Sequence, residues 1–541
     1  MSSSSPTAAE AWLNRLADHG VDYVFGNAGT DFAPLIESLA EAHSDGVSDR
    51  APSVVPVSHE TVAVGMAHGY YLATERPQVV MVHVNVGLAN ALMGIINASR
   101  ENIPMLVASG RTPISEQGRF GSRDLPIHWG QEMFDQGEMV RQFTRWDYEL
   151  RYPDQAPAIV DRALALAQSP PGGPTYVSLP REVLAARLEA PVEVGPVRPA
   201  PTRPAPDPSA VDRVAALMEG CQRPVLVTSR ADHAAQAALS DFVERHRTPV
   251  VQFWPGRLSL ATTSRWNGGF DHRGAMARAD LIIVLDTMVP WIPQVWEPSP
   301  DVPVVAVGPD PMFTDMAFRG FPAQESVYSD VSLFLTALGA RLDSWAGRWD
   351  PESVPSGPPS ADPLGAAVAE VVDSSVTLVN ELGCDPAALR FGDPRRYFSH
   401  PVSGGLGWGL PCALGVKAAR PALPVVAVVG DGSYLFANPL ACHQTATALG
   451  LPVVTVVKNN SAWDAVRKST RGMYPEGAAV SAAVMPLSSL SPSPDYAGAV
   501  EACGGRGFRV ADPGDLSSVL ATALEMSVAE RVQVVIDVDV R

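Results

Sequence analysis

The pattern in the sequence with the clearest chemical use is Gly430-Asp431-Gly432-Ser433, followed after 25 residues by Asn459-Asn460. Each piece comes at the end of a β-branched run that we expect to be a buried strand, Val425–Val429 and Val453–Val457. A helix from about Asn438 to Leu449 connects the two strands. A right-handed crossover of this kind brings both strand ends to one edge of a parallel sheet. We therefore expect these polar residues to lie close together, in the crevice where such sheets bind ligands.

Asp431 and Asn460 would offer a carboxylate and an amide oxygen, which are the hard ligands that Mg²⁺ takes together with water and phosphate oxygens. Gly430 and Gly432 would let the backbone approach those phosphates closely. A chain with a net charge of −18 needs such a local cation to hold an anionic diphosphate. The alternative is that Gly-Asp-Gly forms only a strand-to-helix turn and the asparagines only begin a loop. Because both pieces follow neighbouring strands, the magnesium and diphosphate interpretation is favoured.

The rest of the chain alternates short β-branched runs with longer helical patterns, which is typical of βαβ units. We expect an α/β protein of three doubly wound, mostly parallel sheets. The helices expected in the first third are Glu60–Thr74 and Ala89–Arg100. The other runs expected to form strands are Val54–Val57, Gln78–Val84, Met105–Ala108, Pro224–Thr228, Pro249–Phe253, Leu281–Leu285, Val304–Val307, Ser375–Val379 and Val534–Val538.

Two proline-rich stretches, Ala190–Pro208 and Asp350–Pro363, divide these units, because proline cannot continue a helix or a central strand. We place the domains at residues 1–188, 209–346 and 367–541, with linkers at 189–208 and 347–366.

Composition narrows the possible functions. The chain has 541 residues, of which 46% are apolar, enough for a core in each domain. Its 40 basic and 58 acidic residues, with no basic run, argue against a surface for nucleic acid or anionic membranes. The five scattered cysteines form neither a CxxC pair nor a zinc pattern and fit a reducing cytosol. We see no signal peptide and no membrane span, so we expect a cytoplasmic protein.

The Gly-Asp-Gly-Ser to Asn-Asn pattern resembles the diphosphate and magnesium motif of thiamine diphosphate enzymes, in the group of acetolactate synthase, pyruvate decarboxylase and benzoylformate decarboxylase. The resemblance implies magnesium ligands at Asp431, Asn460 and the backbone oxygen of Ala462. It also implies a pyrimidine-binding first domain, a middle domain and a diphosphate-binding last domain. The remaining residues that it places at the cofactor are Gly383, Cys384, Gly404, Leu406, Gly430, Gly432, Ser433 and Trp463.

The first domain carries a second landmark of that group, a glutamate that opens a helix after a short strand. Here it is Glu60, and the resemblance implies that its carboxylate contacts the cofactor's aminopyrimidine ring and activates it. On its own, an acidic residue in a first helical turn could serve only the helix dipole. Leu406 would be the wedge that bends the cofactor, with an ordinary core leucine as the alternative. The segments Val24–Thr30, Ala98–Gly110 and Ser403–Pro411 also resemble the group.

The resemblance to benzoylformate decarboxylase implies that His83 is an active-site histidine and that Thr30 replaces an active-site serine. A purely structural histidine is the alternative. The second catalytic histidine of that enzyme has no clear equivalent, and the His-His pair of pyruvate decarboxylases is missing, with Ile127–Trp129 in its place. Thr228-Ser229-Arg230 stands where flavin-binding relatives have glycines, so we expect no FAD. The expected substrate pocket comprises Asn27, Gly29, Thr30, His83, Asn85, Trp408 and Val466.

We therefore expect a thiamine diphosphate- and magnesium-dependent lyase or transferase that decarboxylates or ligates a 2-oxo acid through a cofactor-bound acyl carbanion. A 2-hydroxyacyl or oxalyl thioester lyase and a retired homologue that only binds the cofactor stay open as alternatives. A nucleotide-binding Rossmann protein and a serine hydrolase are disfavoured, because their glycine-rich and GxSxG turns are missing. The resemblance implies a homodimer or homotetramer with active sites shared between subunits.

Overall fold

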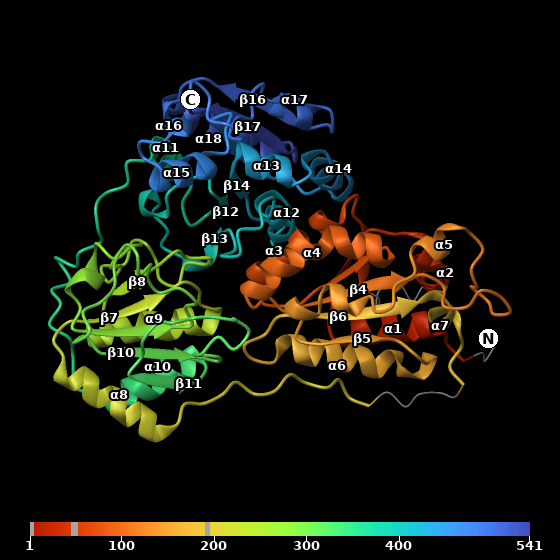
Figure 1. Cartoon of the computed structure of the whole chain (residues 1–541), viewed down its shortest axis with the longest axis horizontal. Helices are drawn as coiled ribbons and strands as arrows, with labels where there is room; N and C mark the ends of the chain where they lie inside the picture. Colours follow the sequence, from red (N-terminus) through yellow and green to blue (C-terminus); the bar gives the residue numbers. More distant parts are fainter. Residues whose placement is uncertain (1–4, 45–51, 190–194) are drawn as a thin grey trace.

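The computed structural model describes residues 5–44, 52–189 and 195–541 and folds them into three α/β units, each built on a parallel sheet (Figure 1). The first unit is drawn in red to orange, the middle one in yellow to green and the last one in blue. The prediction of three doubly wound parallel-sheet domains is confirmed. No helix among the described residues has the length and apolar character needed to cross a membrane.

The first sheet has the strand order β2-β1-β3-β4-β6-β5. Its strands Val79–Val82, Met105–Arg111 and Pro174–Pro180 are buried along their whole length, which suits a parallel sheet covered by helices on both faces. The elements are α1 (Ala8–Asp18), β1 (Tyr23–Gly26), α2 (Ala33–Ser44), β2 (Ser53–Pro56), α3 (Glu60–Thr74), β3 (Val79–Val82), α4 (Val84–Arg100), β4 (Met105–Arg111), α5 (Ile127–Gly130), β5 (Asp147–Glu149), α6 (Ala156–Gln168), β6 (Pro174–Pro180) and α7 (Arg181–Ala185).

The middle sheet has the order β11-β10-β9-β7-β8. Its first helix begins with Pro208 at the end of the first proline-rich stretch, and Asp207 caps that helix. The elements are α8 (Pro208–Gly220), β7 (Pro224–Thr228), α9 (His233–His246), β8 (Val250–Gln252), β9 (Leu281–Leu285), β10 (Val304–Gly308), β11 (Glu325–Tyr328) and α10 (Val331–Arg341).

The last sheet has the order β13-β12-β14-β15-β17-β16. Gly450, in the left-handed conformation, ends the helix that links the two central strands. The elements are α11 (Pro363–Val371), β12 (Thr377–Glu381), β13 (Tyr397–Ser399), α12 (Gly409–Ala419), β14 (Val425–Gly430), α13 (Asp431–Phe436), α14 (Pro439–Leu449), β15 (Val454–Asn459), α15 (Asp464–Met473), α16 (Ala478–Ser481), α17 (Tyr496–Glu501), β16 (Arg506–Val510), α18 (Leu516–Ala529) and β17 (Val534–Asp539).

The first and last units share one continuous hydrophobic core, which runs through the contact of α3 with α12. The two helices approach so closely that a Cβ on Gly69 would overlap the backbone of Cys412, and one on Gly415 would overlap the backbone of Met66. Glycine is therefore required for this packing at both positions. This close packing fixes the sheets of the first and last units relative to each other.

Candidate active site

The predicted neighbours at the last sheet do lie together. β14 and β15 pair in parallel, with Gly430 opposite Lys458, so Asp431 and Asn460 follow adjacent strand ends. One element was missed: α13 begins at Asp431 itself, whereas we expected no helix before Asn438. Gly430 is its N-cap, and the carboxylate therefore stands in the first turn of a helix, where the dipole favours a negative charge.

Asp431 is 3% exposed, and its two oxygens have different surroundings. Oδ1 accepts a hydrogen bond from the N–H of Gly432 at 2.9 Å, while Oδ2 is buried without a partner among the described residues. Burial raises the pKa of this carboxyl, and the N–H groups of Gly432 and of residues 460–462 act in the opposite direction. A buried carboxylate oxygen with no partner is suited to a cation that the protein would bind here.

The neighbouring loop supplies further oxygens. The Oδ1 of Asn460 accepts from the N–H of Ala462 at 2.9 Å, and the carbonyl of Ala462 accepts from the N–H of Asp464 at 3.0 Å. The Trp463 ring lies against Gly432, where a Cβ would overlap it. Among the described residues no group of three or more His, Cys, Asp or Glu side chains is arranged for a metal. A carboxylate, an amide and a carbonyl are nevertheless a donor set that fits Mg²⁺.

Gly383 and Cys384 form the turn after β12, next to β14 in the sheet. The Oδ1 of Asn380 accepts from both of their N–H groups, at 3.1 and 3.0 Å. The Cys384 thiol is buried, and burial raises its pKa, so it stays protonated near neutral pH. The turn therefore offers a fixed backbone at this sheet edge and no reactive thiolate.

The segment that carries Leu406 is held from two sides. The buried Asn97 of α4 accepts from Ser403 Oγ at 2.6 Å and from the Gly405 N–H at 3.2 Å, and its Nδ2 donates to the Gly405 carbonyl at 2.9 Å. Gly404 has φ of +70° and is exposed, and Leu406 is half-buried. This segment thus bridges the first and last units.

Glu381, the last residue of β12, holds the other side of that segment and was missed in the sequence. Its carboxylate accepts from the N–H groups of Gly407 at 2.7 Å and of Gly409 at 2.5 Å. Burial raises the pKa of Glu381 to about 7, against the effect of these hydrogen bonds. The signal that could have found it is an acidic residue two positions after the predicted strand Ser375–Val379, at the sheet edge where that strand ends.

The first sheet gathers the other predicted residues at its carboxyl edge. β1 lies between β2 and β3, with Gly26 opposite both Pro56 and Met81, and the strand order reverses there. Asn27 follows β1 and donates from Nδ2 to the Val57 carbonyl at 2.9 Å. Thr30 is exposed, and Gly29 is partly exposed. A switch point of this kind is where doubly wound sheets bind ligands.

Glu60 is the first residue of α3, as predicted, and is 8% exposed. Its Oε2 accepts a hydrogen bond from Nδ2 of Asn90 at 3.2 Å, a contact that the sequence did not reveal. His59 caps the helix, accepting from the Thr61 N–H at 3.2 Å. The carboxylate is thus buried at the sheet edge, in the first turn of a helix.

The expected strand Gln78–Val84 ends early, at Val82, and α4 begins at Val84 and not at Ala89. His83 is therefore the N-cap of a helix rather than the end of a strand, and Asn85 lies in the first turn of that helix. The β-branched residues Val84 and Val86 gave the misleading strand signal. The Oδ1 of Asn85 is buried without a partner among the described residues.

His83 has two neighbours that sequence reasoning missed. Its Nδ1 is hydrogen-bonded to the carboxylate of Asp31, and its Nε2 lies 3.2 Å from Nε2 of Gln131. Asp31 comes from the 3-10 turn η1 (Thr30–Phe32), and Gln131 follows α5. The sequence spacing of Asp31, His83 and Gln131 does not predict that their side chains meet.

The last two predicted pocket residues come from opposite environments. Trp408 is 3% exposed, and its ring contacts His68 edge-on in the core between α3 and α12. In the single chain it is a core residue. Val466, on α15, is 46% exposed. Their place in a substrate pocket remains a prediction.

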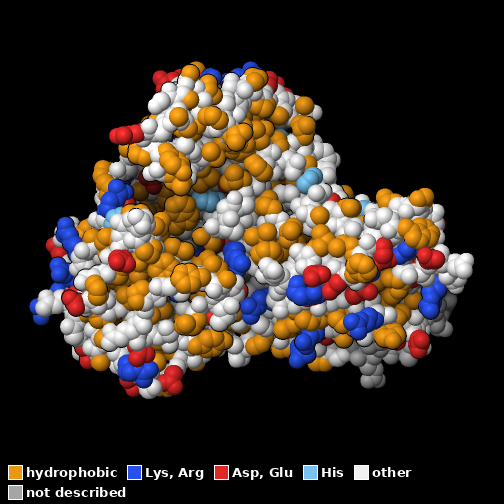
Figure 2. Space-filling model, in the orientation of Figure 1, with side chains coloured by type: hydrophobic (Ala, Val, Ile, Leu, Met, Phe, Trp, Pro, Cys, Tyr) orange, Lys and Arg blue, Asp and Glu red, His pale blue; other side chains and the backbone are white. Residues whose placement is uncertain are grey.

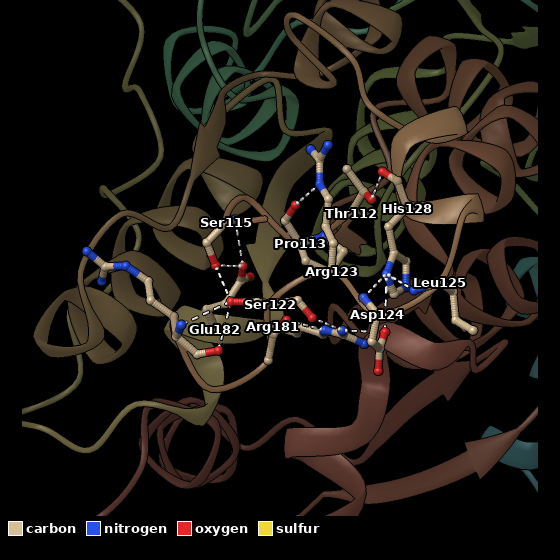
Figure 3. Close-up of polar contacts among 12 residues, drawn as sticks. Thr112, Pro113, Ser115, Ser122, Arg123, Asp124, Leu125, His128, Arg181 and Glu182 are labelled. Atoms are coloured by element: carbon tan, nitrogen blue, oxygen red, sulfur yellow. Dashed lines mark hydrogen bonds and ion pairs between the residues drawn. The ribbon is translucent and has the colours of Figure 1, made fainter. Parts of the chain in front are cut away.

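The segment between β4 and α5 lies at the same edge of the first sheet and is held by residues that follow β6 (Figure 3). Glu182 accepts from the Ser115 N–H at 2.9 Å, and Arg181 donates to the carbonyls of Gly121 and Ser122 at 2.7 and 2.8 Å. His128 accepts from the Asp124 N–H at 3.2 Å, and burial lowers the His128 pKa. We call residues 112–134 the braced region. Large apolar side chains of the braced region are nevertheless exposed, namely Ile114, Phe120, Leu125, Ile127, Trp129 and Phe134.

Comparison with known proteins finds two family matches that together span more than half of the chain. Residues 6–139 match "Thiamine pyrophosphate enzyme, N-terminal TPP binding domain", and residues 382–538 match "Thiamine pyrophosphate enzyme, C-terminal TPP binding domain". The two matched regions contain the two sheet edges described above.

Curated relatives resemble nearly the whole chain. Benzoylformate decarboxylase of Pseudomonas aeruginosa is 26% identical over 491 residues, which cover 85% of this chain and 87% of that protein. The acetolactate synthase large subunit of Haemophilus influenzae is 24% identical, covering 96% and 92%. The structure of a 4-hydroxybenzoylformate decarboxylase from Rhodococcus jostii superposes with a TM-score of 0.81 at 22% identity, covering 99% of each chain, and shows the same fold.

Proposed function

Because the chain belongs to the thiamine pyrophosphate enzyme family, we propose that it is a thiamine diphosphate- and Mg²⁺-dependent decarboxylase or carboligase of 2-oxo acids. The observation that carries the proposal is the buried Oδ2 of Asp431, which has no hydrogen-bond partner in the described part of the chain and lies where β14 and β15 end side by side. Relatives named as decarboxylases and acetolactate synthases support the reaction class.

Asp431, Asn460 and the Ala462 carbonyl would hold Mg²⁺, and Gly383, Cys384, Gly430, Gly432, Ser433 and Trp463 would surround the diphosphate. When bound, the coenzyme supplies an electron sink that no side chain offers. Glu60 would hold a proton against the pyrimidine ring, since it is a buried carboxylate at the carboxyl edge of the first sheet. Leu406 would support the bend of the coenzyme on a segment braced by Asn97 and Glu381.

The substrate would lie against the edge of the first sheet. Thr30 is exposed there and offers a hydroxyl to the carboxylate of a 2-oxo acid. His83 presents Nε2 toward Gln131 at the same edge, where it can hold or release a proton. Asn27, Gly29, Asn85, Trp408 and Val466 complete the proposed pocket.

We also propose a homodimer or homotetramer in which subunits share active sites. Exposed apolar side chains of the braced region and of α15 support this, because soluble chains seldom leave such groups uncovered. Figure 2 shows apolar side chains gathered over the last unit, at the top of the view, and over part of the first. All five cysteines are free, which supports the proposal of a cytoplasmic location. That the middle domain binds no FAD remains a prediction.

Two measurements test the function. Calorimetry should show uptake of thiamine diphosphate with Mg²⁺ and none with a chelator, and no uptake in either condition would contradict the proposal. Carbon dioxide release is then measured on a panel of 2-oxo acids, with and without acceptor aldehydes. Turnover of an oxalyl or 2-hydroxyacyl thioester alone would replace the proposal with the thioester lyase, and uptake without any turnover would indicate a homologue that only binds the coenzyme.

A further inference from the structure

Asp31 is a buried carboxylate whose partner is a histidine. Its side chain is 2% exposed, and it hydrogen-bonds Nδ1 of His83, while its Oδ2 accepts from the N–H of Val84 at 3.4 Å. Within residues 5–44, 52–189 and 195–541 no lysine or arginine forms an ion pair with it. A buried negative charge needs a partner, so the imidazole is the group that can compensate Asp31.

Two glycines lie so close to Asp31 and His83 that no other side chain would fit at their positions. A Cβ on Gly29 would overlap the His83 ring, and a Cβ on Gly110 would overlap the Asp31 carboxylate. The two glycines belong to the loop after β1 and to β4, so the pair is packed between two neighbouring parts of the sheet edge. Such confinement fixes both side chains in one arrangement.

The second ring nitrogen of His83, Nε2, faces Gln131 and not Asp31. The His83 side chain is 20% exposed, and Nε2 lies 3.2 Å from the Gln131 amide nitrogen. The amide of Gln131 can donate to a bare Nε2, and after turning over it can accept from a protonated one. The surroundings of Nε2 therefore accommodate both states of the ring.

We propose that Asp31 is a positioning residue that fixes the His83 ring with Nδ1 toward the interior and stabilises its protonated form, so that Nε2–H serves a 2-oxo acid as donor. This inference rests on the proposed function and deepens it. It assigns to the site a proton donor, the His83 imidazolium, which is paired with the Asp31 carboxylate of the same domain.

The charges around the ring agree with this role. The hydrogen bond from Asp31 is the largest influence and raises the pKa of His83, and the charges of Asp31 and Glu60 act in the same direction. Burial opposes them, and Gln131 is neutral. When Nε2 gives its proton to the substrate's carbonyl oxygen, the N–H bond breaks, an O–H bond forms, and the ring becomes neutral with its Nδ1–H still bound to Asp31.

The direct test follows the ring itself, without any turnover. Histidine labelled at Cε1 is titrated by NMR in the full-length protein, and loss of one resonance in His83→Gln assigns that ring among the 11 histidines. Asp31→Asn should lower the pKa of His83 by at least about one unit. The control Asp22→Asn removes a carboxylate of the same domain that contacts Tyr70 and Arg76, and should leave it unchanged. An unshifted His83 in folded Asp31→Asn overturns the inference.

A comparison of unfolding temperatures tests the inference even if Asp31→Asn folds poorly. His83→Gln leaves the buried carboxylate without a cation, whereas Asp31→Asn combined with His83→Gln removes the charge as well. The double variant should therefore unfold at a higher temperature than His83→Gln. If the double variant unfolded at a lower temperature than His83→Gln, the Asp31 carboxylate would not need the charge of the His83 ring, and the inference would be overturned.

The catalytic readout is the pH profile of kcat/KM on an active 2-oxo acid. Activity should fall as pH rises through the pKa of His83, and in Asp31→Asn this limb should move to lower pH by the shift seen in the ring titration. If the alkaline limb of the kcat/KM profile stays at the same pH in Asp31→Asn, the proposed role of Asp31 is overturned. If no 2-oxo acid reacts while the ring titrates as expected, the proposed function fails and the pairing of Asp31 with His83 stands.

Discussion

The carboxylate of Glu381 accepts a hydrogen bond from the N–H of Gly407, 2.7 Å away, and so links the end of β12 to the glycine-rich segment that carries Leu406. The same carboxylate accepts from Gly409 at 2.5 Å. A titratable group inside the last domain thus holds the backbone that we propose bends the coenzyme. Stability of this region should therefore depend on pH.

Burial raises the pKa of Glu381 to about 7 from its ordinary 4.5. The folded chain then binds more protons than the unfolded chain between these values, so the stabilising contribution is complete below about pH 4.5 and is lost as pH rises through 7. The loss is on the order of 3 kcal/mol. Urea unfolding of the coenzyme-free protein from pH 5 to 8 should show this slope, and Glu381→Gln should flatten it. Equal slopes in the two proteins would be incompatible with a buried, titrating Glu381.

Asp431→Asn removes the buried charge that we propose binds Mg²⁺. The affinity for thiamine diphosphate in the presence of Mg²⁺ should fall about 100-fold, which corresponds to about 2.8 kcal/mol. Calorimetry with Mg²⁺ and with a chelator measures this. The control is Asp464→Asn, which changes a carboxylate of the same region that pairs with Lys468 on α15, and it should keep wild-type affinity. Similar losses in both variants would argue against a specific ligand at Asp431.

Glu60→Gln keeps the shape of the side chain and removes its ability to hold a proton as a carboxylate. Turnover of a 2-oxo acid should fall roughly 100- to 10,000-fold, while the coenzyme affinity changes little. Initial rates and calorimetry on the same preparation separate the two effects. Glu75→Gln, at the other end of α3, serves as the matched control and should stay active. Full turnover of Glu60→Gln would refute the proposed role.

Phe134→Glu tests the proposed contact between subunits. Phe134 is fully exposed in the single chain, and a charge there should weaken self-association at least 100-fold if a partner covers it. Sedimentation velocity measures the oligomeric state, and activity should be lost with the oligomer. Phe318→Glu changes an equally unusual exposed ring in the middle domain and provides the comparison. An oligomer that survives Phe134→Glu but not Phe318→Glu would move the interface elsewhere.

Local patterns in the sequence were enough to predict the three α/β domains and most of their strands and helices. The strands Pro224–Thr228 and Leu281–Leu285 and the helix Glu60–Thr74 have the predicted bounds, because each is a buried run or a helical period with clear ends. The beginnings of α4 and α13 were missed. A helix start depends on a cap and on contacts from outside, such as the bond from the Val84 N–H to Asp31, more than on the apolar period.

The sequence by itself determined the neighbourhood of Asp431 and Asn460, since two strands joined by a crossover helix must bring their ends to one edge. Only the tertiary structure decided the partners of His83 and Glu60 and of the segment that carries Leu406. Asp31 and Asn90 bind His83 and Glu60, and Asn97 and Glu381 bind backbone groups on either side of Leu406, at sequence separations from 26 to 308 positions. Contacts between elements leave no periodic signal in a sequence, because they depend on how separately formed helices and sheets pack together.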